Sequence, residues 1–294
     1  KLPGVSHTCG HDGHMTMLLA LGRVISRKPI KCGKVVLMFQ PSEENGQGAR
    51  AVVSDARYKQ IKPDLAFAIH IEPGRPFGYV STRPGLINCA SLGLKITLHG
   101  KTAHAADPSD GISPSLAVAE FIQKISEFNH GDELNNNFRL TTVTHVQIGE
   151  QSFGISPGDA SIFVTLRTSN DDSLSQLDKD VRELVSNIST KFKLTFDFEI
   201  FDHFAASIND KEAHDIAVNA MKALNINYGS IGVPMRASED FGIFGKQSKA
   251  AMLCLGPGED YAALHNPDYD FNDDLIPIGT GIFERITRDL LGTY

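Results

Sequence analysis

The chain alternates between two kinds of hydrophobic pattern. Apolar residues predict helices from Asp12 to about Arg27 and near residues 48–58. Short, continuous apolar runs at 34–39 and 64–71 are typical of buried parallel strands. Because strands and helices alternate, this part of the chain predicts an α/β sheet with helices on its faces.

The pattern changes after the Pro-Gly pair at 73–74. Residues 90–100 alternate apolar and polar side chains, as in a strand that is exposed to water on one face. The following segments predict a helix, two strands, a helix and a strand, at about 113–128, 139–148, 159–168, 171–191 and 193–201. The order strand, helix, strand, strand, helix, strand matches a ferredoxin-like α+β unit.

From about Asp202 the α/β pattern returns. It predicts two helices and a strand, near 211–223, 274–291 and 250–256. At 294 residues the chain is long enough for about two domains. We therefore expect an α/β domain formed by residues 1–87 and 204–294, with a ferredoxin-like α+β domain of residues 88–203 inserted into it.

Composition and charge narrow the possible partners. A formal net charge of −7, with no block of lysine or arginine, argues against a nucleic-acid-binding or anionic-membrane surface. The longest apolar runs are far shorter than the roughly 18 residues of a membrane span, and no signal-peptide pattern is visible. Four cysteines are scattered without paired spacing, as in a reducing compartment. We expect a soluble, cytoplasmic protein.

Two short clusters carry the residues best suited to chemistry. In HTCGHDGH, Cys9 and His11 flank a glycine, and in FQPSEENGQG, Glu43 and Glu44 follow a predicted strand. Thiolate, imidazole and carboxylate together suit Zn²⁺ and similar ions. His70 ends the apolar run DLAFAIH and is expected at the same sheet edge as the acidic pair. This pattern favours a hydrolytic metal centre in which one acid binds metal and the other takes a proton from an activated water.

Each candidate has a simpler explanation when it is taken alone. A Cys-x-His pair is often a buried thiol beside a turn, an acidic pair is usually solvated, and a histidine in an apolar strand is usually a hydrogen-bonded core residue. His265, in ALHNPDYDFND, is weak evidence by itself. His104 has the character of an exposed loop histidine, and Arg167 that of a surface arginine paired with Asp171 or Asp172. The metal interpretation therefore depends on these residues meeting in space.

Six blocks, in a fixed order along nearly the whole chain, resemble one known family. They are HTCGHDGH, FQPSEENGQGA, AIH at 68–70, GKTAHAADPSDGISP, ASEDFGIF at 237–244 and LHNPDYDFND at 264–273. Together they resemble the aminoacylase and carboxypeptidase amidohydrolase family of dimetal hydrolases, and most of all its hippurate hydrolase and auxin-conjugate hydrolase branch. The resemblance implies a zinc-peptidase-like α/β domain with an inserted dimerisation domain.

The resemblance also assigns roles to residues at the matching positions. It implies two divalent metal ions per subunit, with Zn²⁺ as the first choice and Mn²⁺, Co²⁺ or Ni²⁺ also compatible with the donors. The implied metal ligands are Cys9, His11, Glu44, His70 and His265. Glu43 takes the place of the general base and acid. Asp12 is expected to hold an imidazole in orientation, whereas Glu239 and Asp240 match a motif near the site without a firm role.

Two further residues acquire roles only through the resemblance. His104 matches a histidine that reaches the active site of a neighbouring subunit and supports the oxyanion, so a homodimer formed through the inserted domain is expected. Arg167 matches a residue that binds the free carboxylate of the substrate. The expected reaction is hydrolysis of the amide bond of N-acyl amino acids or short peptides by a metal-activated water.

Two other classes of function stay open on the sequence. One is a catalytically inactive protein of the same fold that binds metal and amino-acid conjugates, although such a protein has no use for Glu43 beside the ligands. The other is a thiol hydrolase with Cys9 as nucleophile and His11 as its base, which leaves the other candidate ligands unexplained.

The sequence departs from the family pattern in two places. Family members usually carry a long segment before the first cluster, whereas this sequence reaches it directly after Lys1, so the sheet is expected to lack its first strands. The family also tends to have Asn-x-Ile-Pro where residues 153–157 here read Phe-Gly-Ile-Ser-Pro. The second departure leaves the preferred substrate open.

Overall fold

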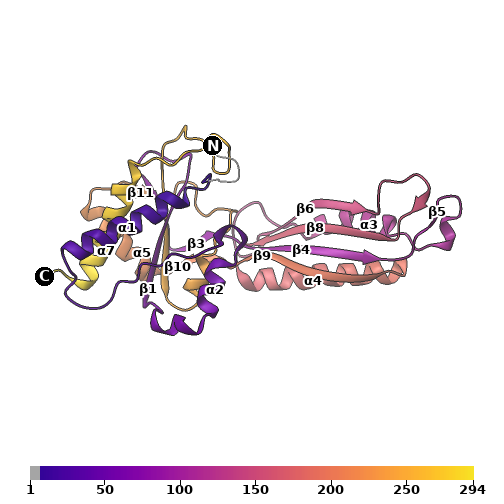
Figure 1. Ribbon diagram of the computed structural model, residues 1–294, viewed down its shortest axis with the longest axis horizontal. Coiled ribbons are helices and arrows are strands. Elements are labelled where there is room, and N and C mark those ends of the chain that lie inside the picture. The colour runs from indigo at the N-terminus through magenta and orange to yellow at the C-terminus, as the bar shows by residue number, and fades with distance from the viewer. Residues whose placement is uncertain (1–6) are drawn as a thin grey trace.

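A computed structural model describes residues 7–294 as two parts that lie end to end along one long axis (Figure 1). One part is layered and contains both chain ends of the described region. The other is an elongated antiparallel sheet backed by helices. None of the helices in the described residues is long and apolar enough to span a membrane.

The layered part is built on a four-stranded mixed sheet with the order β1-β12-β2-β11. Strands β1 (Leu65–Ile71) and β12 (Lys249–Leu255) run parallel, with His70 opposite Cys254. Strand β2 (Val80–Ser81) is antiparallel to β12 and parallel to β11 (Tyr228–Gly229). The carboxyl end of β1 therefore places His70 at the edge where the loops after the parallel strands gather.

Helices cover both faces of this sheet, as the sequence predicts. Helices α1 (His11–Arg27), α5 (Lys211–Ala223) and α7 (Leu275–Leu291) pack in one core cluster with Ile69, Ile71, Leu253 and Leu255. Side chains alternate along a strand, so Ala66 belongs to the opposite face, where α2 (Gly48–Ser54) and α6 (Gly242–Gly245) pack with the 3₁₀ helix Ala56–Gln60.

The elongated part is an antiparallel sheet with the order β6-β8-β4-β9. Its elements are β4 (Ala90–His99), α3 (Ser115–Ile125), β6 (Arg139–Ile148), β8 (Asp159–Thr168), α4 (Asp171–Phe192) and β9 (Thr195–Phe204). Leu92, Leu94, Ile96 and Leu98 of β4 alternate toward the helices and are buried with them. This succession confirms the ferredoxin-like α+β unit, and the two parts together confirm the predicted fold class.

Two small sheets lie at the ends of the elongated part (Figure 1). Strands β3 (Gly85–Asn88) and β10 (Ser207–Asn209) pair where the chain passes between the two parts. Strands β5 (Ala103–His104) and β7 (Ile155–Ser156) pair at the far tip.

The predicted buried strand at 34–39 is wrong. Residues 34–39 form no strand in the structure, and Val36 and Phe39 are 40% and 46% exposed. A buried strand needs hydrogen-bonded neighbours, and residues 34–39 have none among the strands of residues 7–294. The terminal strand of the sheet, β1, pairs only with β12 among the described strands. The segment instead packs Leu37 against the cluster of α1 and β1.

Candidate metal centre

The first cluster is shaped by a glycine in a left-handed conformation. Gly10 has φ of 77°, and a Cβ placed there would lie 2.7 Å from the hydroxyl oxygen of Tyr269, so both backbone and space require glycine. The turn leaves Cys9 just outside α1 and makes His11 the first residue of that helix. The thiol and the imidazole therefore start from one rigid turn.

The acidic pair lies on a one-turn 3₁₀ helix, Glu43–Asn45. Positive φ angles at Ser42 and Gly46 bend the chain sharply on both sides of it. The two acids face different surroundings, as neighbouring residues do. Glu44 Oε1 and Oε2 lie 3.9 Å from His11 Nε2 and 3.5 Å from His265 Nε2, respectively.

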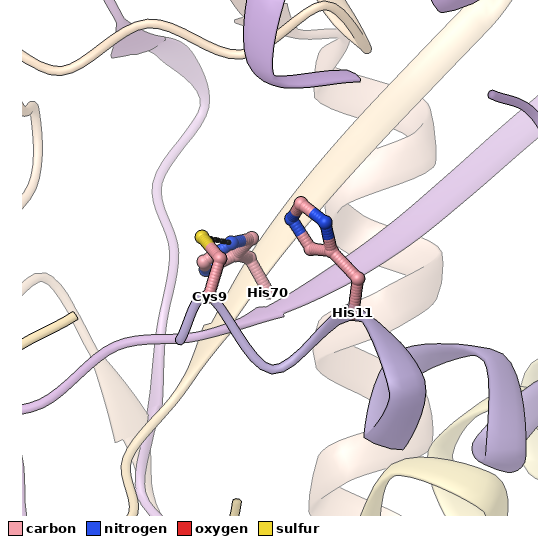
Figure 2. A group of neighbouring side chains, drawn as sticks. All are labelled: Cys9, His11 and His70. Carbon is pink, nitrogen blue, oxygen red and sulfur yellow. Dashed lines mark hydrogen bonds between the residues drawn. The ribbon is translucent and has the colours of Figure 1, made fainter. Parts of the chain in front are cut away.

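His70 and His265 complete the ring of candidate ligands. His70 Nε2 lies 3.5 Å from Cys9 Sγ, and Figure 2 shows this contact with His11 beside it. His265 lies in the loop before α7 with φ of 65°, and its backbone N–H donates to the carbonyl oxygen of Thr8 at 2.8 Å. That hydrogen bond ties the loop of His265 to the turn of Cys9.

The structure thus brings all five predicted ligands together with Glu43. Three sets have ligand atoms that all lie within 4.8 Å of one another: Cys9, His11 and His70; Cys9, Glu44 and His265; and His11, Glu43 and Glu44. The sets share Cys9, His11 and Glu44. Overlapping sets of this kind can serve two neighbouring cations, with shared residues between them.

Burial and crowding shift the pKa values of these groups. Burial, followed by the charge of Glu239, raises the pKa of Glu43 to about 9, and burial raises the pKa of Glu239 to about 8. Burial and then Glu44 raise the pKa of the Cys9 thiol. Burial also lowers the pKa of His11. Crowded acidic groups with raised pKa values form a site that positive charge would stabilise, because a cation favours thiolate and carboxylate.

One buried nitrogen supports the fit of a metal. His11 Nε2 is buried without a hydrogen-bond partner among the described residues, and its nearest carboxylate oxygens, at 3.7 and 3.9 Å, are too distant for a hydrogen bond. Buried polar atoms are rarely left in this state. The mixture of nitrogen, oxygen and sulfur donors suits Zn²⁺ and related divalent ions.

Two neighbours of the cluster had no role in the sequence prediction. His14 Nε2 accepts a hydrogen bond from Ile71 N at 3.0 Å, its ring centroid is 4.7 Å from that of His70, and burial holds its pKa well below the usual value. Its spacing of three from His11 puts both on one helix face and is a signal that the sequence offers. Glu239, which the block ASEDFGIF placed near the site without a firm role, has its Oε1 3.5 Å from His70 Nε2.

Two predicted residues pair with groups other than the candidate ligands. Asp12 Oδ2 lies 3.1 Å from His7 Nδ1, so its imidazole partner is His7. His104 lies in β5 at the far tip of the elongated part, exposed, and its Nδ1 accepts a hydrogen bond from Ala106 N (Figure 1). The structure does not bring His104 to the cluster of its own chain.

Arg167 lies nearer, at the end of β8. Its Nη1 donates to the carbonyl oxygen of Arg236 at 2.8 Å and to Ser238 Oγ at 2.9 Å, directly before Glu239 in the chain. Burial lowers its pKa. No carboxylate of the described residues lies within ion-pair distance of Arg167, so the simpler expectation of a pair with Asp171 or Asp172 is not met.

Comparison with known proteins decides the family. The model of peptidase family M20/M25/M40 matches residues 1–289. The chain belongs to this family. This M20 member is a hydrolase, a metal-dependent amidohydrolase, as the sequence resemblance implied.

Its similarities extend over nearly the whole chain. This M20 member is 27% identical over 287 residues to the N-acetyldiaminopimelate deacetylase of Exiguobacterium sibiricum, covering 98% of this chain and 76% of the relative. It is 30% identical over 312 residues to the IAA-amino acid hydrolase ILR1-like 4 of Arabidopsis thaliana, covering 99% and 68%. A dinuclear metal-binding M20 peptidase of Bacillus subtilis shares the fold with a TM-score of 0.79 at 21% identity, over 100% of this chain and 76% of that one.

Proposed function

We propose that this M20 member hydrolyses the amide bond of N-acyl amino acids or short peptides. The observation that carries the proposal is the convergence of a thiol, three imidazoles and two acids from four separate segments. The names of two relatives agree in kind, because a deacetylase of an acetylated amino acid and a hydrolase of an auxin–amino acid conjugate both act on such amides.

Cys9, His11, Glu44, His70 and His265 are the proposed ligands of two divalent ions. Such ions, when bound, polarise a carbonyl group and make water acidic enough to lose a proton near neutral pH. Glu43 is the proposed base, because its carboxylate borders the ligands and is less exposed than that of Glu44. It takes the proton of the attacking water and returns it to the leaving nitrogen, which must be protonated to depart.

The substrate is proposed to extend toward the elongated part. Arg167, half-buried and without a carboxylate partner among the described residues, offers a guanidinium to the free carboxylate of the amino acid. A guanidinium that is partly buried and has no carboxylate partner favours an anion beside it, because the charge of the anion offsets the hydration that the guanidinium lost on burial.

The inserted part is proposed to complete the site between subunits. We assign residues 88–203 to an inserted dimerisation domain and residues 1–87 and 204–294 to the catalytic domain. His104, at the exposed tip, is then available to a second copy of the chain, where it would support the oxyanion. This arrangement requires a homodimer.

The proposal is tested by hydrolysis of N-acetyl and N-benzoyl amino acids, measured with metal-loaded and with chelated protein beside elemental analysis. We expect about two ions per chain and turnover that chelation removes and metal restores. Binding of these compounds without turnover would instead favour the inactive binding protein. Turnover that is insensitive to chelation and lost in Cys9→Ala would favour the thiol hydrolase.

A further inference from the structure

A buried ion pair lies just beyond the proposed ligand His70. Arg75 Nη1 is 3.2 Å from Glu72 Oε2, and the two side chains are only 6% and 18% exposed. Removing two charges from water is costly, so a buried pair is weak evidence for stability by itself. The partners of the two side chains show what else the pair does.

Arg75 fastens the end of β1 to a distant loop. Its Nε donates to Ser81 Oγ at 3.0 Å and to the carbonyl oxygen of Ile231 at 3.2 Å, and its Nη2 donates to the carbonyl oxygen of Gly232 at 3.2 Å. A Cβ on Gly232 would lie 2.9 Å from Nη2, so the absence of a side chain at this position leaves room for the guanidinium. With its donors fixed on several sides, Arg75 can hold Glu72 in one place.

Glu72 in turn faces the rear nitrogen of His70. Its Oε1 lies 3.8 Å from His70 Nδ1, and that nitrogen is 2.7 Å from the carbonyl oxygen of Ile71. A carbonyl oxygen only accepts, so Nδ1 carries the hydrogen and Nε2 keeps its lone pair. That Nε2 points to the thiol of Cys9, which is 3.5 Å away.

We propose that Glu72 and Arg75 are positioning residues that reinforce the Nδ1–H tautomer of His70, which the carbonyl oxygen of Ile71 selects, and the ring orientation that a metal ligand requires. The proposal rests on the proposed role of His70 as a ligand. Glu72 acts electrostatically on the Nδ1–H group, and Arg75 acts through Glu72. Partners of this kind usually contribute about 10–100-fold to metal affinity.

The test is a Co²⁺ titration of metal-stripped protein, followed by visible absorption. We expect Glu72→Gln and Arg75→Met to bind Co²⁺ about 10–100-fold more weakly with an altered spectrum. Nitrogen NMR of the metal-free protein gives a second readout: His70 should carry its proton on Nδ1 in both proteins, because the carbonyl oxygen of Ile71 accepts it, and the Nδ1 signal should shift in Glu72→Gln because the nearby carboxylate charge is gone. The matched control is Arg139→Met, which removes the Arg139–Asp180 ion pair between β6 and α4 of the elongated part and should leave Co²⁺ affinity unchanged.

A double variant separates positioning from simple stability. Glu72→Leu with Arg75→Met removes both charges, so it should fold without an unpaired buried charge, yet still bind Co²⁺ more weakly. Wild-type affinity in the double variant, or in Glu72→Gln, would overturn this inference alone. Absence of Co²⁺ binding by the wild type would overturn the proposed function as well.

Discussion

Adjacent residues Glu43 and Glu44 show how position divides the work of two identical side chains. Glu44 is 54% exposed and spans from His11 to His265, whereas Glu43 is 21% exposed and turned toward the buried Glu239. A metal ligand needs a carboxylate oxygen turned toward the other ligands, but a base needs a sheltered place beside the water. The two environments therefore agree with the proposed roles of Glu44 as a ligand and Glu43 as the base.

Changing Glu43 to Gln tests this division. We expect the variant to keep its two ions, because the ligands are intact, and kcat to fall by about 10²–10⁴-fold, since the proton acceptor is lost. Elemental analysis and steady-state kinetics measure the two quantities. Glu44→Gln is the control and should lose metal. Turnover near the wild-type rate in Glu43→Gln would remove Glu43 from its proposed role.

The sequence predicts individual residues well where a short motif fixes their geometry. Cys9 and His11 are separated by one glycine, so their proximity follows from the turn itself. Their meeting with His265 depends on a long-range backbone hydrogen bond to Thr8, and no local pattern predicts it. The resemblance to the family implied that His265 joins Cys9 and His11. It gave no role to His14, although His14 shares a helix face with His11.

At the scale of elements, we expect substitution by alanine to have opposite effects on stability at two helical glycines. A Cβ at Gly13 of α1 would lie 2.3 Å from the ring of Phe271, which is 8% exposed, whereas a Cβ at Gly281 of α7 meets nothing within 4 Å. We expect Gly13→Ala to lower the free energy of unfolding by about 1–3 kcal/mol through overpacking. Gly281→Ala should raise it by up to about 1 kcal/mol through helix propensity.

Denaturant unfolding of both variants checks this pair. Because the two substitutions are chemically identical and both lie inside helices, the difference between them isolates the contact with Phe271. Equal stabilisation by both would show that the ring moves aside at no cost.

A histidine ties three strands of the elongated sheet and should make its stability depend on pH. His99 of β4 lies 2.9 Å from Asp159 of β8 and 3.2 Å from Asp197 of β9, and the hydrogen bond to Asp159 is the main cause that raises its pKa. A raised folded pKa gives stability that is complete below the unfolded value of about 6.5 and is lost as pH rises through the folded value.

We therefore expect His99→Gln to destabilise the protein at pH 5.5 by under about 1 kcal/mol, since the pair is partly exposed, and to have little effect at pH 8.5. Urea unfolding at both pH values measures the difference. The double variant Asp159→Asn with Asp197→Asn should lose the part of the pH dependence of stability that comes from His99. A larger effect at high pH would contradict the assignment.

Elements were predictable where the pattern is decided within one segment. The strands and helices of the elongated part follow from alternation and helical spacing, because each buries its own apolar face. The segment 34–39 has an equally apolar pattern but forms no strand, because a strand also requires a ladder of backbone hydrogen bonds to a neighbouring strand, and residues 34–39 form none with the described strands. Composition alone does not reveal whether such a ladder forms.

At the scale of the whole molecule, the position of His104 makes a prediction about mixtures. If it serves the site of a second subunit, His104→Ala and Glu43→Gln should each be nearly inactive, but a mixture allowed to exchange subunits should regain activity. Each mixed dimer then contains one complete site, so an equal mixture should reach about a quarter of the wild-type rate. A mixture of two Glu43→Gln preparations is the control. Full activity of His104→Ala by itself would remove the shared-site arrangement.

The margin of β1 that faces away from β12 affects how a dimer with a shared active site can be detected by experiment. Among residues 7–294, β1 pairs only with β12, so its other margin has no strand partner. An unpaired strand margin can pair with a strand of another molecule. A change of mass in sedimentation or gel filtration is therefore not by itself a sign of the proposed shared site, and recovery of catalysis on mixing is the measurement that identifies it.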